Sequence, residues 1–327
     1  MAAAGEQTES LLVLVHIPRT AGTTLAMILR YHYRGGGFHG GGNVFARSEE
    51  IEARLRGIAA KPHVRAVSGH MTFGLANRVL PSARYLVILR DPVERTLSHY
   101  SALLRARPAS PGAAVRRTGL LPAGLPPAPP GSTIEEVLAR KDYIPDNLQT
   151  RMLCGIGSPY DELPAGALER SKRNLRKRFA FVGTTERFDA LLALLNLELG
   201  WPAIAYRRSR AKGRTTRDEL TPRALALIEE RNALDRELHA YAAELLDEAL
   251  ERAGPELKAE LEVVQEAGRR WSERRKAPGT GEIRSLAHEA RVALALKEAE
   301  LARAAVQIRR LDRAGKALRK ERRQRGG

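Results

Sequence analysis

Residues 11–24 read LLVLVHIPRTAGTT, and this stretch decides the fold class. Its first part, Leu11–His16, is a short apolar run that predicts a buried strand. From Leu25 onward, the letters LAMILRYHY place apolar side chains at helical spacing. The segment Pro18–Thr24 therefore joins a strand to a helix, and that junction is the repeating unit of α/β proteins.

The same alternation of strand and helix continues along the chain. Apolar runs at 64–67, 85–89 and 179–182 predict three more strands, and a segment with helical spacing follows the runs at 85–89 and 179–182. Residues 35–42, GGGFHGGG, are interpreted as a flexible loop. We therefore predict an α/β fold with a P-loop-like, mostly parallel sheet flanked by helices, and a C-terminal helical extension.

A change in composition sets the predicted domain boundary. Pro222 opens a predicted helix that runs to about Arg252, and the chain becomes more basic per residue after it. We therefore predict an α/β domain over residues 1–254 and a basic helical tail over residues 255–327.

The tail combines a weak heptad pattern with a polybasic end, RKERRQRGG. Lys297 and Gly315 interrupt the heptad pattern. The apolar positions of this seam are Leu294, Leu301, Ala304, Ile308, Leu311 and Leu318. A weak coiled coil, a solvated helix and a basic arm for an acidic surface all fit. We expect a helix with a modest capacity to form a homo-oligomer.

Composition excludes several classes of protein. The 327 residues contain one cysteine, which excludes an internal disulfide framework and a cysteine-built zinc site. A hydrophobic fraction of 43% supports a packed core and excludes wholesale disorder. Neither a membrane span nor a signal peptide is evident, so we expect a cytoplasmic protein. The net charge of +17 indicates an anionic ligand or an acidic polymer.

The loop after the first predicted strand has the features of an anion cradle. Gly22 allows a close backbone approach, Thr23 and Thr24 bring hydroxyls to the start of a helix, and Arg19 adds a fixed positive charge. The complete loop is Pro18, Arg19, Thr20, Ala21, Gly22, Thr23 and Thr24. It lacks the Walker A pattern, and an ordinary turn with a threonine cap is the alternative.

Two further candidates follow the next predicted strands, at the sheet edge where ligands bind in such folds. Arg90 ends one strand, and Ser98 lies about two helical turns later, so both could bind one phosphate. An ion pair between Arg90 and Asp91 is the alternative. His70 could be a general base or a structural histidine. The other histidines lack metal-ligand spacing, so we predict no metal site.

Five segments in order carry a resemblance to a known family. They are HIPRTAGTTL, SGHMTFG, RDPVERTLSHY, DNLQTRMLCG and FVGTTERF. Together they resemble the sulfotransferases of the heparan-sulfate 2-O/6-O type and their bacterial relatives, from about Leu11 to Tyr241. Those enzymes take a sulfuryl group from 3′-phosphoadenosine 5′-phosphosulfate (PAPS), so the resemblance implies a glycan or other hydroxyl-bearing acceptor.

The resemblance also implies roles for individual residues. Pro18–Thr24 matches the loop that binds the 5′-phosphosulfate, Arg90 and Ser98 match the pair that binds the 3′-phosphate, and His70 matches the catalytic base. Asn147, Gln149 and Arg151 lie in a segment similar to one that borders the family's active site. The basic loop Arg207–Arg217 lies where relatives close over the nucleotide or acceptor.

One departure from the family pattern keeps other functions open. Arg19 occupies the position where the family has a lysine, and arginine is a poorer proton donor with a planar fork of donors. A PAPS-binding pseudoenzyme is therefore one alternative. A basic nucleic-acid-binding protein is another, although an aromatic content of 5% offers few rings for stacking bases.

Overall fold

The chain forms two compact units in the computed structural model. The first unit spans Met1–Arg187 and Ala211–Asp247, and the second spans Phe188–Arg210 and Glu248–Gly327. The structure describes residues 11–42, 48–105, 128–129, 131–140, 142–203, 205–206, 215–274, 300–301, 303–311 and 313. The predicted division at residue 254 stays a prediction.

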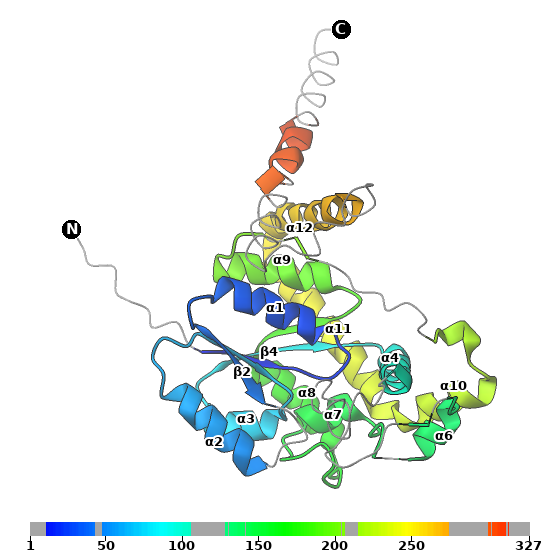
Figure 1. The fold of residues 1–327 in the computed structure, drawn as a ribbon. Helices are drawn as coiled ribbons and strands as arrows, with labels where there is room; N and C mark the ends of the chain where they lie inside the picture. The colour runs from blue at the N-terminus through cyan, green and yellow to red at the C-terminus, as the bar shows by residue number, and fades with distance from the viewer. Residues whose placement is uncertain are drawn as a thin grey trace. The chain divides into compact units, whose positions relative to one another are not determined.

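The first unit is built on a five-stranded, all-parallel sheet with strand order β2-β3-β1-β4-β5 (Figure 1). The strands are β1 (Leu12–Val15), β2 (Phe38–Gly42), β3 (Ala66–Gly69), β4 (Arg84–Leu89) and β5 (Phe179–Thr184). Every side chain of β1 is buried, as expected for a parallel sheet covered on both faces. The predicted α/β fold with a mostly parallel sheet flanked by helices is confirmed.

Helices cover both faces of this sheet. Helix α1 lies over one face, and α2, α3 and α8 lie over the other (Figure 1). The main core lies on the second face, where Val13, Tyr85 and Val87 of the sheet pack with side chains of these helices. The helices with most or all of their residues in this unit are α1 (Gly22–His32), α2 (Ser48–Ala59), α3 (Phe73–Val79), α4 (Pro92–Arg105), α6 (Ile134–Ala139), α7 (Leu148–Leu153), α8 (Ala167–Arg178), η1 (Arg217–Glu219), α10 (Pro222–Arg231) and α11 (Ala233–Arg252).

Two sequence-based predictions of local structure are wrong. Residues 35–42 contain the edge strand β2, which pairs with β3 through its main chain even though most of its residues are glycine. The single helix predicted after Pro222 is two helices, α10 and α11, because α10 ends at Asn232. The Asn232 side chain donates a hydrogen bond to the Ile228 oxygen (2.9 Å).

The helix start predicted at Pro222 is confirmed, and a second helix start is well capped. Thr133 caps α6 and forms a capping box with Glu136. Thr221 caps α10, and Pro222 lies in its first turn, where the missing N–H costs nothing.

The described part of the second unit is mainly helical. It includes α9 (Phe188–Leu199) and α12 (Gly254–Arg274), and residues 300–301 and 303–311 are also helical. Helices α9 and α12 pack together, and Asn196 donates a hydrogen bond to Glu260 (2.9 Å). The described part of the tail is therefore helical, as predicted. Across the described residues of the whole chain, none of the helices is long and apolar enough to cross a membrane.

The helix over residues 300–311 has two different faces. Arg303, Arg309 and Arg310 pair with glutamates of α12 over 3.2–3.9 Å. The opposite face carries Leu301, Ile308 and Leu311, which are 41%, 66% and 66% exposed. Four positions of the predicted seam lie outside the described residues: Leu294, Lys297, Gly315 and Leu318.

Candidate functional site

Three loops of chemical interest meet at the carboxyl edge of the sheet. β1 is the central strand, with β3 on one side and β4 on the other. Arg19 follows β1, His70 follows β3, and Arg90 follows β4. The strands β2 and β3 lie on one side of β1, and β4 and β5 lie on the other, so the strand order reverses its direction at β1. In open α/β sheets, ligands bind at the point where the strand order reverses.

The loop between β1 and α1 has a strained backbone. Arg19 and Ala21 have φ values of 71° and 65°, which lie in the left-handed region. For a residue other than glycine, this conformation costs about 1–2 kcal/mol. The buried Thr20 between them donates its hydroxyl to the Ile17 oxygen (2.9 Å). Within the described chain no side chain caps α1. A strained loop ahead of an uncapped helix start is suited to an anion.

Gly22 makes room for a side chain of the protein itself. A Cβ atom at this position would lie 2.0 Å from the Cδ2 atom of His16. We predicted that this glycine allows close approach of a ligand, and the structure identifies the His16 imidazole as its close neighbour. The sequence pattern predicts no role for His16, although this residue lies directly between the strand and the loop.

His16 and His70 form a pair. Their ring centroids are 4.1 Å apart, and the Nδ1 atom of His70 lies 2.7 Å from the His16 main-chain oxygen. Because a carbonyl oxygen only accepts, Nδ1 of His70 carries the hydrogen and Nε2 keeps its lone pair. Burial lowers the pKa of His70, although the hydrogen bond to the His16 oxygen acts in the opposite direction. Burial, then the nearby His70 and Arg19, lower the pKa of His16 to about 2. Both rings are therefore neutral at pH 7.

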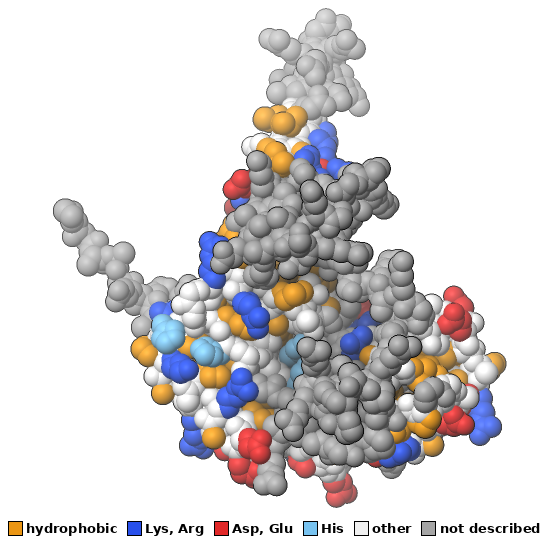
Figure 2. Space-filling model, in the orientation of Figure 1, with side chains coloured by type: hydrophobic (Ala, Val, Ile, Leu, Met, Phe, Trp, Pro, Cys, Tyr) orange, Lys and Arg blue, Asp and Glu red, His pale blue; other side chains and the backbone are white. Residues whose placement is uncertain are grey.

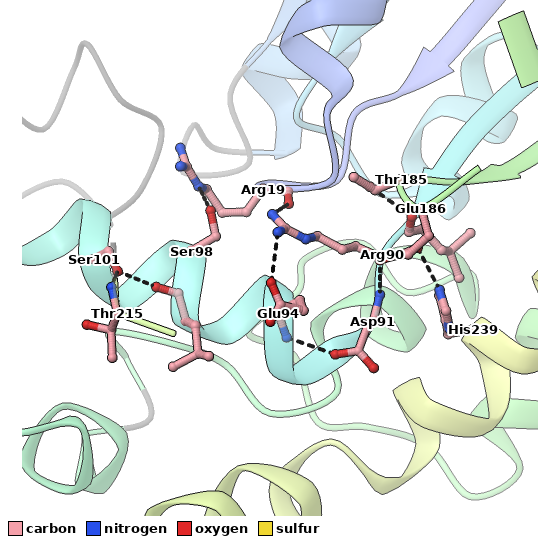
Figure 3. Close-up of polar contacts among 12 residues, drawn as sticks. Arg19, Arg90, Asp91, Glu94, Ser98, Ser101, Thr185, Glu186, Thr215 and His239 are labelled. Carbon is pink, nitrogen blue, oxygen red and sulfur yellow. Dashed lines mark hydrogen bonds and ion pairs between the residues drawn. The ribbon is translucent and has the colours of Figure 1, made fainter. Parts of the chain in front are cut away.

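Arg19, Arg90 and Ser98 meet at this edge (Figure 3). The Nε atom of Arg19 donates to the Ser98 hydroxyl (3.1 Å), and Nη1 of Arg90 donates to the Arg19 oxygen (3.2 Å). Nη2 of Arg90 pairs with Glu94 (3.3 Å). The two residues assigned to one phosphate, Arg90 and Ser98, are thus linked through Arg19.

Asp91 has a different role from the ion pair considered as an alternative. Its carboxylate accepts from the Glu94 N–H (2.9 Å) and so caps α4 ahead of Pro92. Its own N–H donates to Glu186 (3.1 Å), which also pairs with His239 (3.1 Å), as Figure 3 shows. These contacts fix the start of α4, the helix that carries Ser98.

The segment with Asn147, Gln149 and Arg151 supports the site from behind. Gln149 bonds to the main chain of Arg90 (2.9 and 2.8 Å). Arg151 binds main-chain oxygens and the Asp146 carboxylate (3.0 Å). Asn147 caps the start of α11. The contacts of Gln149 and Asn147 could not be predicted from the sequence, because they join residues that are far apart in the chain.

Most of the basic loop Arg207–Arg217, which was expected to close over the nucleotide or acceptor, lies outside the described residues. Across the described residues, no group of three or more histidine, cysteine or acidic side chains could hold a metal ion. In Figure 2 the lysines and arginines of the described surface lie at separate points of the visible face, without a continuous basic stripe.

Comparison of the chain with protein-family models and with curated proteins gives no match.

Proposed function

We propose that the chain is a cytoplasmic sulfotransferase with a P-loop-like sulfotransferase version of the α/β fold, which transfers a sulfuryl group from PAPS to a hydroxyl of a carbohydrate or glycan. The observation that carries this proposal is the linked set of Arg19, Arg90 and Ser98 at the sheet edge. The neighbouring strand β3 ends at Gly69, directly before the neutral His70. Two cationic side chains and one base suit a donor with two anionic ends and an alcohol acceptor.

The donor would be bound at its two anionic ends by different residues. Arg19 and the uncapped first turn of α1 would bind the 5′-phosphosulfate, since helix N-termini and arginines both favour anions. Arg90 and Ser98 would bind the 3′-phosphate and so select PAPS over ATP or ADP. PAPS, when bound, supplies the sulfuryl group. The proposal needs no metal ion.

The chain's residues would then perform a single displacement. His70 takes the acceptor hydroxyl proton at Nε2 while the oxygen forms its bond to sulfur. The bond between sulfur and the bridging phosphate oxygen breaks, and its electron pair stays on that oxygen. Arg19 and the α1 N-terminus stabilise this negative charge. The products are a sulfate ester and adenosine 3′,5′-bisphosphate.

One observation favours a second candidate, a protein that binds PAPS without transferring its sulfuryl group. Arg19 replaces the lysine of the resembling enzymes, and its Nε atom is already bonded to Ser98. The arginine would have to act through its terminal nitrogens. The experiment below separates this candidate from the enzyme.

The test combines nucleotide binding with transfer. In a thermal shift assay, adenosine 3′,5′-bisphosphate should raise the melting temperature more than AMP, with or without EDTA. With radiolabelled PAPS, the native chain should then label an acceptor from a panel of glycans and cell-envelope extracts. The His70→Ala variant should not label that acceptor. Nucleotide preference without transfer supports the second candidate. Retention on DNA at matched salt, with no nucleotide preference, overturns both and supports a nucleic-acid-binding protein.

We further propose that the tail helix joins two or more copies of the chain. Leu301, Ile308 and Leu311 form an exposed stripe at heptad spacing, while the opposite face of the helix pairs with α12. A stripe with a period of seven residues suits pairing with the same stripe of a second copy.

A further inference from the structure

Gln149 is bonded to both main-chain groups of Arg90. Its Oε1 atom accepts from the Arg90 N–H (2.9 Å), and its Nε2 atom donates to the Arg90 oxygen (2.8 Å). Gln149 is fully buried on α7, 59 residues away in the chain. Arg90 directly follows β4, which ends at Leu89. The carboxamide therefore continues the pairing that a neighbouring strand would give this residue.

The helix that carries Gln149 is itself held by an exchange of caps. The Asn147 side chain accepts from the N–H groups of Leu234 and Asp235 (2.9 and 3.2 Å) at the start of α11. In return, the Asp235 carboxylate accepts from the N–H groups of Gln149 and Thr150 (3.0 and 2.7 Å) at the start of α7. Each helix thus satisfies the free donors of the other, which fixes the position of Gln149.

The main chain of Arg90 sets the direction in which its side chain leaves the sheet edge. From there the guanidinium reaches the Arg19 oxygen (3.2 Å) and Glu94 (3.3 Å). We propose that Gln149 is a positioning residue, which aims the Arg90 guanidinium at the 3′-phosphate and so sets the preference for a 3′-phosphorylated nucleotide. This inference rests on the proposed function.

The experiment measures nucleotide preference by titration calorimetry of the full-length chain. Gln149→Met keeps the side-chain length and removes both hydrogen bonds. We expect binding of adenosine 3′,5′-bisphosphate to weaken about ten-fold, because a misaligned guanidinium loses its paired bonds to phosphate. Binding of AMP should change by less than about two-fold, since AMP lacks the group that Arg90 would bind.

Three further variants separate positioning from general support of the fold. Ser171→Ala removes a buried hydrogen bond to the Thr150 oxygen (3.2 Å) without touching Arg90, and should keep the native preference. Gln149→Glu accepts from the Arg90 N–H but cannot donate to its oxygen, so it should lower the preference even if the methionine variant fails to fold. In an Arg90→Ala background, Gln149→Met should cause no further loss.

This design distinguishes failure of the proposed function from failure of the positioning role. A native chain that binds AMP as well as adenosine 3′,5′-bisphosphate overturns the proposed function. A native chain that prefers the bisphosphate, with Gln149 variants that keep this preference or weaken both nucleotides equally, overturns the positioning role alone.

Discussion

The Nδ1 atom of His70 donates a hydrogen bond to the main-chain oxygen of His16 over 2.7 Å. This bond fixes the hydrogen on Nδ1 and leaves the Nε2 lone pair free to accept a proton. The two rings are also in contact, with centroids 4.1 Å apart and planes tilted by 32°. The position and the protonation of the proposed base therefore both depend on one neighbour at the end of β1.

His70→Ala should lower the rate of sulfuryl transfer by about 10²–10⁴-fold, the usual effect of removing a general base. The affinity for adenosine 3′,5′-bisphosphate should stay nearly constant, because the base would contact the acceptor. Radiolabel transfer and calorimetry measure the two quantities. His63→Ala is the control, because that histidine is exposed and precedes β3, at the opposite edge of the sheet. An unchanged rate in the His70 variant rejects its assignment as the base.

The rate should also depend on pH in a defined direction. Burial lowers the pKa of His70 from the ordinary value of 6.5. A base must be neutral to accept a proton, so kcat/KM should be constant near pH 7 and should fall only below pH 6.5. An acidic limb centred above pH 7 would contradict this prediction.

Stability should fall in acid because His16 resists protonation. Its pKa is about 2 in the folded chain, while the unfolded chain binds this proton near pH 6.5. The contribution of His16 is thus fully present above pH 6.5 and is lost between pH 6.5 and 2, at up to about 1.4 kcal/mol per pH unit.

Urea unfolding at pH 7 and pH 5 measures this effect. His16→Asn should reduce the difference between the two free energies of unfolding, and His63→Asn, at an exposed position, should not. Equal pH dependence in the native chain and the His16 variant would show that another group is responsible.

Gly22→Ala should destabilise the fold by about 1–3 kcal/mol, the usual cost of overpacking. The new Cβ atom would lie 2.0 Å from the His16 ring, which packs against the His70 ring, so transfer should slow as well. Gly57→Ala on α2 is the control, because a Cβ there has no neighbour within 4 Å and should add about 0.5–1 kcal/mol of stability. A double variant with His16→Ala should recover stability, and failure to do so contradicts the clash.

Arg19→Lys should bind the donor more weakly and transfer more slowly, by about five- to ten-fold each, although the charge is kept. Lysine has no counterpart of the Nε–H that donates to Ser98 (3.1 Å), and one such bond contributes about 1 kcal/mol. Adding Ser98→Ala to Arg19→Lys should weaken donor binding further, because Ser98 would also bind the 3′-phosphate. A lysine variant as fast as the native chain would mean that Arg19 is a tolerated substitute.

Ile308→Asp with Leu311→Asp should lower the mass of the full-length chain measured by light scattering, because both side chains are 66% exposed on the proposed seam. Met27→Asp, at another exposed apolar position in α1, is the control and should leave the mass unchanged. Substitution is preferable to deleting residues 255–327, since that deletion removes α12 from α9. An unchanged mass in the double variant rejects self-association through this stripe.

Side-chain pattern explains which elements were predictable. The strands β1, β4 and β5 are apolar runs that are buried, so the sequence indicates them directly. The strand β2 was missed, because glycines carry no side-chain signal and this strand exists through its main-chain pairing with β3. The break at Asn232 is also absent from the side-chain pattern, because the first turn of α11 donates to Asn147, 87 residues away in the chain.

The strand positions in the sequence indicate which loops carry the candidate site. In a parallel sheet the residues after each strand lie on one edge, so Arg19, His70 and Arg90 could be assigned to it from strand positions alone. Which of these residues are in contact depends on the packing of the folded chain. Arg19 meets Ser98 across 79 residues, and Gln149 meets Arg90 across 59. Local spacing carries no information about such pairs, because they depend on how whole helices pack against the sheet.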